Sequence, residues 1–178
     1  MVKAAPTLRP QAFASRLRLE QALTQPFNAG FWRRLGAAIG LGRARCLFRS
    51  ADRGAQVVGA TALILLEVDE AQDIAAEKYD RDFVPMAAST NATRVLYGTA
   101  WRADDLLQRT RDLNLVRMRY DGIPRHLDVP WERVAETNPA YARHVETERA
   151  RLGENHPLFL TQYCLRAVAG KGKFLSVS

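Results

Sequence analysis

The sequence lacks several features that identify common classes of protein. Only two of its 178 residues are cysteines, Cys46 and Cys164, which excludes a small domain held together by a disulfide framework. No stretch approaches the roughly 18 consecutive apolar residues that a membrane span requires. Residues 1–10 contain no apolar core of a signal peptide. We therefore expect a cytoplasmic protein with no membrane partner.

Motifs for metal and phosphate binding are also absent. No Gly-x-x-x-x-Gly-Lys-Ser/Thr loop occurs, and Gly170-Lys171-Gly172-Lys173 lacks its spacing. The glycines between residues 36 and 42 do not fit Gly-x-Gly-x-x-Gly either. The three histidines share no metal-ligand spacing with one another or with the cysteines, which excludes the usual zinc motifs; they are His126, His144 and His156.

The composition is that of a globular domain with excess positive charge. Apolar residues make up 47% and charged residues 25%, which allows one domain with a real core. The net charge is +7, and arginine far outnumbers lysine among the 26 basic residues. Arginine suits phosphate recognition, so the charge permits nucleic-acid binding without establishing it. The nearest approach to a basic patch is Arg33, Arg34, Arg43, Arg45, Arg49 and Arg53.

An apolar run, Leu63–Val68, ends in the acids Asp69 and Glu70. Such a run is typical of a strand covered on both faces, and its carboxyl end would deliver the acids to the edge where α/β sheets bind ligands. This is the Walker B pattern, in which Asp69 would hold Mg²⁺ and Glu70 would activate the attacking water. Alternatively, the acids only place negative charge in the first turn of the next helix.

The middle of the chain alternates strand and helix signals, which predicts an α/β fold with a parallel sheet and flanking helices. Residues 1–10 read as an extended segment before the first helix. We predict helices at Gln11–Thr24, Ala71–Tyr79, Asp82–Ser89 (broken near Pro85) and Trp101–Asp112, and further strands at Arg43–Ser50 and Thr93–Tyr97.

The last third of the chain reads as a hairpin followed by helices. Val116–Tyr120 alternates apolar and charged residues, and Asp121-Gly122 predicts a turn before Ile123–Val129. Asn138-Pro139 predicts a helix start that Gly153 ends. A short helix at 156–164 and a loose tail, Gly170–Ser178, would complete the chain.

Read together, Leu65–Asp73 and Thr90–Trp101 resemble the ATPase half of a bacteriophage terminase large subunit. Weaker similarity upstream at Ala5–Gln11 and downstream at 138–163 extends the resemblance over most of the chain. It implies a partial P-loop NTPase fold of the additional-strand, catalytic-Glu type with a C-terminal helical extension. The Asp-Glu-Ala-Gln-Asp string also resembles superfamily-1 helicases, where Gln72 and Asp73 would sense the nucleotide.

The same resemblance implies roles and partners. Gly98-Thr99-Ala100 would be the coupling motif, with Thr99 reporting loss of the γ-phosphate. Mg²⁺ and ATP would be the cofactor and substrate, and double-stranded DNA, the portal and the small terminase subunit would be the partners in a bacterial host cell. Residues 1–130 would be the partial ATPase domain and residues 131–178 a helical linker toward a nuclease domain.

Two departures from the family pattern limit this interpretation. The Walker A loop and the nuclease domain are both absent from the sequence, so we expect an internal fragment that hydrolyses ATP poorly alone. Loss of a central strand would leave an exposed sheet edge and favour self-association. Two alternatives stay open: a non-catalytic prophage remnant that binds DNA or a partner, and a fragment of a superfamily-1-like helicase.

Overall fold

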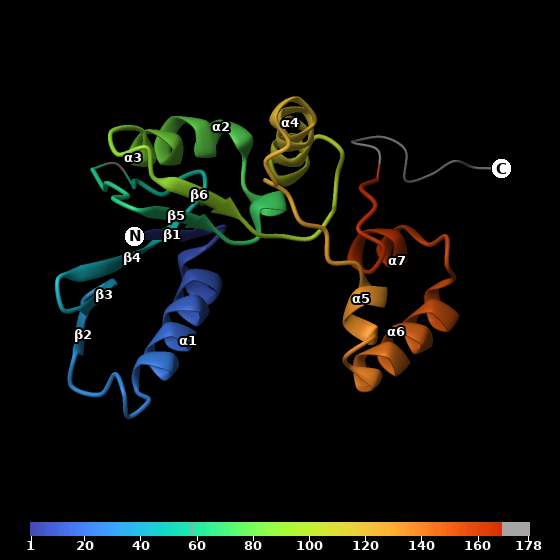
Figure 1. The fold of residues 1–178 in the computed structure, drawn as a ribbon, viewed down its shortest axis with the longest axis horizontal. Coiled ribbons are helices and arrows are strands. Elements are labelled where there is room, and N and C mark those ends of the chain that lie inside the picture. The colour runs from blue at the N-terminus through green and yellow to red at the C-terminus, as the bar shows by residue number, and fades with distance from the viewer. Residues whose placement is uncertain (58, 169–178) are drawn as a thin grey trace. The chain divides into compact units, whose positions relative to one another are not determined.

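A computed structural model describes residues 1–57 and 59–168 (Figure 1). The chain divides into two compact units, Met1–Gly98 and Thr99–Ser178. The first unit contains a six-stranded sheet, and the second is helical in its described part. The predicted functional boundary at residue 130, between a partial ATPase domain and a helical linker, stays a prediction.

The sheet of the first unit has the order β2-β3-β4-β1-β5-β6. Strands β4, β1, β5 and β6 are parallel to one another, whereas β2, β3 and β4 form an antiparallel meander. The α/β prediction is confirmed, and the meander is an addition that the sequence did not predict. The strands are β1 (Val2–Ala5), β2 (Trp32–Leu35), β3 (Ala38–Leu41), β4 (Ala44–Ser50), β5 (Leu65–Val68) and β6 (Thr93–Leu96).

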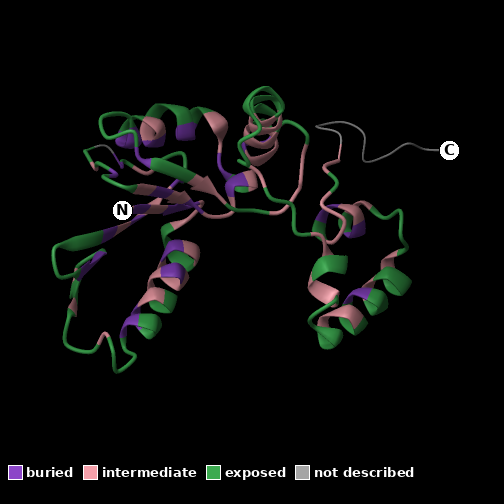
Figure 2. Cartoon of the chain, viewed as in Figure 1, coloured by how far each residue is buried: buried purple, intermediate pink, exposed green. Residues whose placement is uncertain are grey.

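The first residues of the chain form a central strand of the sheet. Residues 1–10 were predicted to be an extended segment before the first helix, but β1 lies between β4 and β5. Val2 and Ala4 are fully buried, and most of this strand has the colour of buried residues in Figure 2. The described sheet is therefore continuous from β2 to β6, and its two outer strands are β2 and β6.

Helix α1 (Phe13–Leu23) covers one side of the sheet, after the short turn η1 (Leu8–Ala12). The helix predicted at Gln11–Thr24 is thus confirmed. Its buried side chains pack with residues of β1, β3 and β4, because each element presents apolar side chains to the same layer. This core consists of Ala5, Ala12, Leu23, Ile39, Cys46 and Phe48.

The opposite side of the sheet carries a run of short helical elements (Figure 1): η2 (Ala71–Asp73), α2 (Ala76–Lys78), η3 (Tyr79–Phe83) and α3 (Val84–Ala88). The helix predicted from Ala71 is interrupted after η2, where Ile74 and Ala75 are extended. The predicted break near Pro85 corresponds to the boundary between η3, which ends at Phe83, and α3, which begins at Val84. The proline lies in the first turn of α3, where a missing N–H costs little.

The second unit contains α4 (Leu106–Asp121), α5 (Trp131–Ala135), α6 (Pro139–Leu152) and α7 (Pro157–Gln162). The two predicted helices after residue 137 are confirmed. The Asn138 side chain accepts a hydrogen bond from the Tyr141 amide at 3.1 Å, and Gly153 ends the helix with φ +91°.

The predicted hairpin at Val116–Val129 is wrong, since Val116–Tyr120 belongs to α4 and residues 123–129 form neither helix nor strand. Gly122 has φ +71° and donates its amide to the Met118 carbonyl, so it caps the helix instead of turning a hairpin. The predicted helix start at Trp101 is also early, because Asp105 caps α4 by accepting from the Gln108 amide.

Among the described residues, no helix is both long and apolar enough to cross a membrane. The predicted loose tail, Gly170–Ser178, lies outside the described residues.

Candidate functional site

The acids Asp69 and Glu70 lie at the carboxyl end of β5, an interior strand that pairs in parallel with β1 and β6. The strand forms here because Leu66 and Val68 are fully buried on one face of the sheet. It begins two residues later than predicted, since Leu63 and Ile64 are 68% and 72% exposed and precede it. The acids therefore emerge where parallel sheets present ligand-binding groups.

Two backbone hydrogen bonds join the turn after β5 to the residue that follows β6. The Tyr97 amide donates to the Val68 carbonyl at 2.8 Å, and the Ala71 amide donates to the Tyr97 carbonyl at 2.9 Å. Between these two bonds, Glu70 adopts a left-handed conformation with φ +49° and ψ +48°. That conformation costs a non-glycine residue on the order of 1–3 kcal/mol and is concentrated at functional sites.

The Glu70 carboxylate has a defined partner. Gln72 Nε2 donates to Glu70 Oε2 at 2.7 Å, and the Asp73 amide donates to the Glu70 carbonyl at 3.0 Å. The structure thus brings Gln72 to the acid that the sequence assigned as a general base. An amide donor fixes the direction of a carboxylate without neutralising it.

The Asp69 carboxylate is held by residues that the sequence did not single out. Ser15 Oγ of α1 donates to Asp69 Oδ2 at 3.3 Å, and Lys3 Nζ of β1 lies 3.9 Å from the same oxygen. The Lys3 ammonium is also 3.5 Å from Glu67 Oε2. These contacts join β1, α1 and β5 around one carboxylate.

Tyr97 completes this group from the end of β6. Its hydroxyl donates to Glu67 Oε1 at 3.3 Å, and its ring centroid is 5.9 Å from Lys3 Nζ. Burial, followed by the negative charge of Glu67, raises the pKa of the Tyr97 hydroxyl, which keeps it a neutral donor at physiological pH. The one sequence signal for Lys3 was its place as a single charge within the apolar Val2–Ala5.

The predicted coupling triplet begins directly after this tyrosine. Gly98 follows Tyr97 and belongs to the first unit, and the boundary between the two compact units falls between Gly98 and Thr99. Strands β5 and β6 pair along their whole length, so the two acids and the triplet follow neighbouring parallel strands.

The single carboxylate of Asp69 fits a magnesium ion whose other ligands would be phosphate oxygens of a substrate. Both side-chain contacts of Asp69 among the described residues go to Oδ2, and its side chain is 28% exposed. The described residues contain no group of three or more His, Cys, Asp or Glu side chains able to hold a metal. Magnesium commonly binds through one or two carboxylates together with substrate phosphates.

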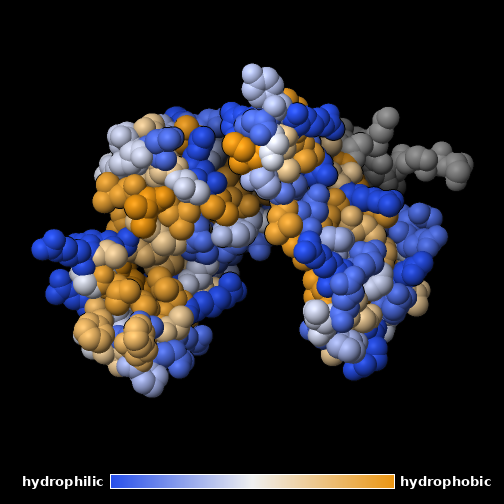
Figure 3. Space-filling model, viewed as in Figure 1, coloured by the Kyte–Doolittle hydropathy of each residue, from blue (hydrophilic) through white to orange (hydrophobic). Residues whose placement is uncertain are grey.

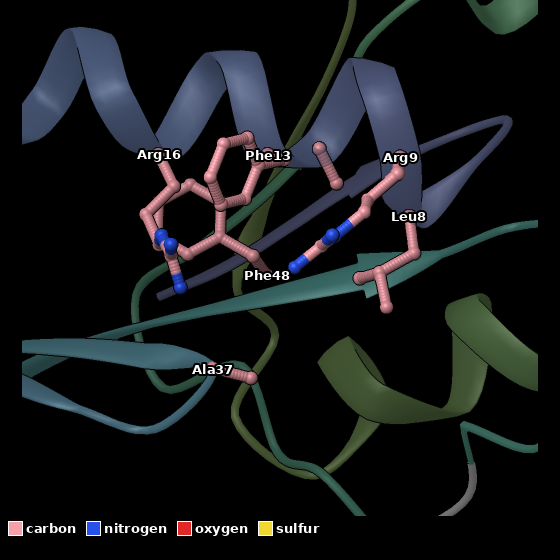
Figure 4. Close-up of a pocket in the computed structure, with 7 residues that line it drawn as sticks. Leu8, Arg9, Phe13, Arg16, Ala37 and Phe48 are labelled. Atoms are coloured by element: carbon pink, nitrogen blue, oxygen red, sulfur yellow. The ribbon is translucent and has the colours of Figure 1, made fainter.

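A pocket of about 120 Å³ lies elsewhere in the first unit, against η1 and α1 (Figure 4). The Phe13 ring is flanked there by two guanidinium groups, with Arg9 Cζ at 5.2 Å and Arg16 Cζ at 4.6 Å from its centroid. Arg16 also pairs with Glu20 at 3.3 Å, which neutralises one of the two charges. The lining residues are Leu8, Arg9, Ala12, Phe13, Arg16, Ala37 and Phe48.

The arginines of the meander do not form one patch. Arg33 and Arg45 are both exposed, and both are paired with Gly40 of β3, so their side chains lie on the same face of the sheet. Arg34 instead forms two hydrogen bonds with the buried Glu20, with Nε–Oε1 at 2.9 Å. These bonds outweigh burial and lower the pKa of the Glu20 carboxyl.

Two solved structures resemble this chain along 94% of its length. The ATPase domain of the large terminase of Thermus phage P74-26 is 16% identical, with a TM-score of 0.63 and 76% of its own chain covered. The large terminase of a thermophilic bacteriophage is 10% identical, with a TM-score of 0.62 and 40% of its chain covered. No protein-family model and no curated protein matches the sequence. The chain therefore has the fold of the ATPase domain of phage large terminases.

Proposed function

We propose that the chain is part of a terminase-like DNA-packaging ATPase and that Asp69 and Glu70 are its Walker B acids. One observation carries the proposal. The acids follow an interior parallel strand, β5, and the neighbouring strand β6 leads through Tyr97 into Gly98-Thr99-Ala100. The fold shared with phage terminase ATPase domains supports the same assignment.

Each residue then has a distinct role. Asp69 is the ligand that would hold Mg²⁺, which when bound neutralises charge on the phosphates of ATP. Glu70 accepts the proton of the attacking water and is aimed by the Gln72 amide. Thr99 couples the state of the γ-phosphate to the second unit, and Gln72 with Asp73 senses the nucleotide.

The partners follow from the same proposal. ATP hydrolysis would drive translocation of double-stranded viral DNA, together with a portal and a small terminase subunit, in the cytoplasm of a bacterial host. The sequence contains no Walker A loop, so backbone amides and a lysine for the phosphates are not supplied by it. We therefore expect slow hydrolysis by this chain alone.

A sensitive assay of phosphate release from radiolabelled Mg·ATP tests the assignment. Glu70→Gln should lower the rate to background, because an amide cannot accept the proton. Glu77→Gln, the same change at an exposed position of α2, should keep the parent rate. Hydrolysis by Glu70→Gln at the parent rate would contradict the proposal.

Binding provides a second readout that does not depend on turnover. Asp69→Asn should weaken Mg·ATP binding measured by isothermal titration calorimetry, since it removes the charge that attracts the metal. Glu77→Gln again serves as the control. Equal binding by the parent and Asp69→Asn would remove Asp69 from the site.

A second candidate function is binding of DNA or a partner chain without catalysis. The outer edge of β6 is not paired within the described sheet, and such an edge can accept a strand from another copy. The net charge of +7 and the exposed Arg33 and Arg45 suit a phosphate backbone. Concentration-dependent sedimentation, together with DNA binding unaffected by Glu70→Gln, would favour this function.

A further inference from the structure

The Lys3 ammonium occupies the space between two carboxylates of the candidate site. Lys3 lies opposite Glu67 in the parallel ladder of β1 and β5, so both side chains project to the same face of the sheet. The ammonium is 3.5 Å from Glu67 Oε2 and 3.9 Å from Asp69 Oδ2. All three side chains are at least 70% buried, where a charge pair is screened less than on an open surface.

The remaining neighbours keep this lysine in place. Its Nζ lies 5.9 Å from the centre of the Tyr97 ring, a geometry that favours a cation. The Tyr97 hydroxyl in turn donates to the other oxygen of Glu67. The lysine is therefore held by an aromatic ring and two acids contributed by neighbouring strands.

Ser15 contacts the same Asp69 oxygen but differs from Lys3 in charge. It is 7% exposed, and its hydroxyl donates to Oδ2 at 3.3 Å. A neutral hydroxyl orients a carboxylate and leaves its negative charge available to a metal. An ammonium ion neutralises that charge, so it opposes the binding of a second cation.

We propose that Lys3 is a built-in counter-ion of Asp69 and Glu67 that opposes divalent-cation binding at Asp69, whereas Ser15 is a positioning residue that favours it. This inference rests on the proposed function because it concerns the same Asp69 carboxylate. In the absence of metal, the lysine stabilises two acids that would otherwise repel each other. A divalent ion at Asp69 has to overcome this ammonium, which sets the metal concentration that the site requires.

The two partners of Asp69 should therefore have opposite effects when removed. Lys3→Met keeps the aliphatic stem and deletes the charge, and it should tighten Mn²⁺ binding about five- to tenfold. Lys3→Gln should act in the same direction, and Lys3→Arg should stay close to the parent because the charge is kept. Ser15→Ala should weaken binding, because Asp69 loses its orienting hydrogen bond.

The test is titration of the full chain with Mn²⁺ alone, with free Mn²⁺ measured by electron paramagnetic resonance. Arg43→Gln is the matched control, since it removes one positive charge from the turn before β4, at the other end of the parallel strands. Circular dichroism checks that each variant is folded, and Lys3→Gln replaces Lys3→Met if the latter unfolds. Binding by the neutral Lys3 variants no tighter than by Arg43→Gln would overturn the inference.

Asp69→Asn separates this inference from the proposed function. If this substitution leaves Mn²⁺ binding unchanged, the metal does not bind at Asp69, and both the metal assignment and the role of Lys3 fail. If it abolishes binding while the neutral Lys3 variants match the control, Asp69 keeps its assigned role and only the inference about Lys3 fails.

Discussion

The two compact units of the chain are stabilised in different ways. The first unit, residues 1–98, contains most of the buried apolar side chains of the described residues, on both sides of its sheet. In the described part of the second unit, residues 99–168, the apolar residues that reach the same burial are Leu106, Val145 and Phe159. Packing therefore contributes more to the first unit than to the second.

The ion pairs of the two units also differ in how far they are exposed to solvent. In the first unit, Lys78 and Asp82 form a pair whose side chains are 3% and 10% exposed. In the second unit, Arg151 is 62% exposed in its pair with Glu148, and hydrophilic side chains cover much of the visible face of α6 (Figure 3). Exposed pairs are screened by salt and contribute little, so helix caps and a few contacts must hold this unit.

The largest effect should come from Phe83→Ala. Phe83 is the fully buried last residue of η3, and truncating its side chain should destabilise the first unit by about 3–5 kcal/mol. Urea unfolding reports it through Trp32, in a background where Trp101 and Trp131 are replaced by Phe. Phe27→Ala, at a side chain 90% exposed, is the control and should stay within about 0.5 kcal/mol.

Acid should weaken the first unit through Asp82. Hydrogen bonds from Arg81, and then from Lys78, lower the pKa of this carboxyl to about 2, below its ordinary value. A lowered pKa in the folded state means that the stabilisation is present above about pH 5 and is lost as the pH falls toward 2. Asp82→Asn should flatten the pH dependence of the urea midpoint over this range, and Glu77→Gln should not. Equal slopes for the parent and Asp82→Asn would contradict this prediction.

Val145→Ala tests the packing of the second unit. Val145 is the fully buried residue of α6, and losing two methyl groups should cost about 2 kcal/mol. A variant that keeps Trp131 as its single tryptophan reports the transition of this unit. Val116→Ala, at a side chain 63% exposed, is the control. An undetectable loss at Val145 would mean that the second unit has no packed core.

Strong local patterns explain what the sequence predicted. The apolar run before Asp69 and Glu70 is long enough to indicate a buried strand, and the acids mark its carboxyl end. The Asn138-Pro139 start and the Gly153 end of α6 are caps with a local physical cause. Both features are decided by residues close together in the sequence.

The errors occurred where a pattern was short or ambiguous. Strand β1 is central in the sheet, but it has only four residues, two of them alanines, and so short a segment shows no periodic pattern. Alternation in Val116–Tyr120 fits a strand, and Gly122 suits a hairpin turn as well as a helix cap. Tertiary packing also brought Ser15 to Asp69 across 54 residues, a contact that no local pattern contains.

The smallest effect should come from Arg151→Ala in α6. Arg151 Nε lies 3.0 Å from Glu148 Oε1, but the pair is exposed, so its loss should shift the Trp131-reported midpoint less than Val145→Ala does. The shift should vanish in about 1 M salt, where the screening length falls to about 3 Å. Arg143→Ala makes the same change in the same helix at a residue without an ion pair in the described structure, so the difference between the two variants isolates the pair. If Arg151→Ala proved as costly as Val145→Ala, charge and packing would contribute equally to the second unit, and the contrast between the units would rest on the number of buried side chains alone.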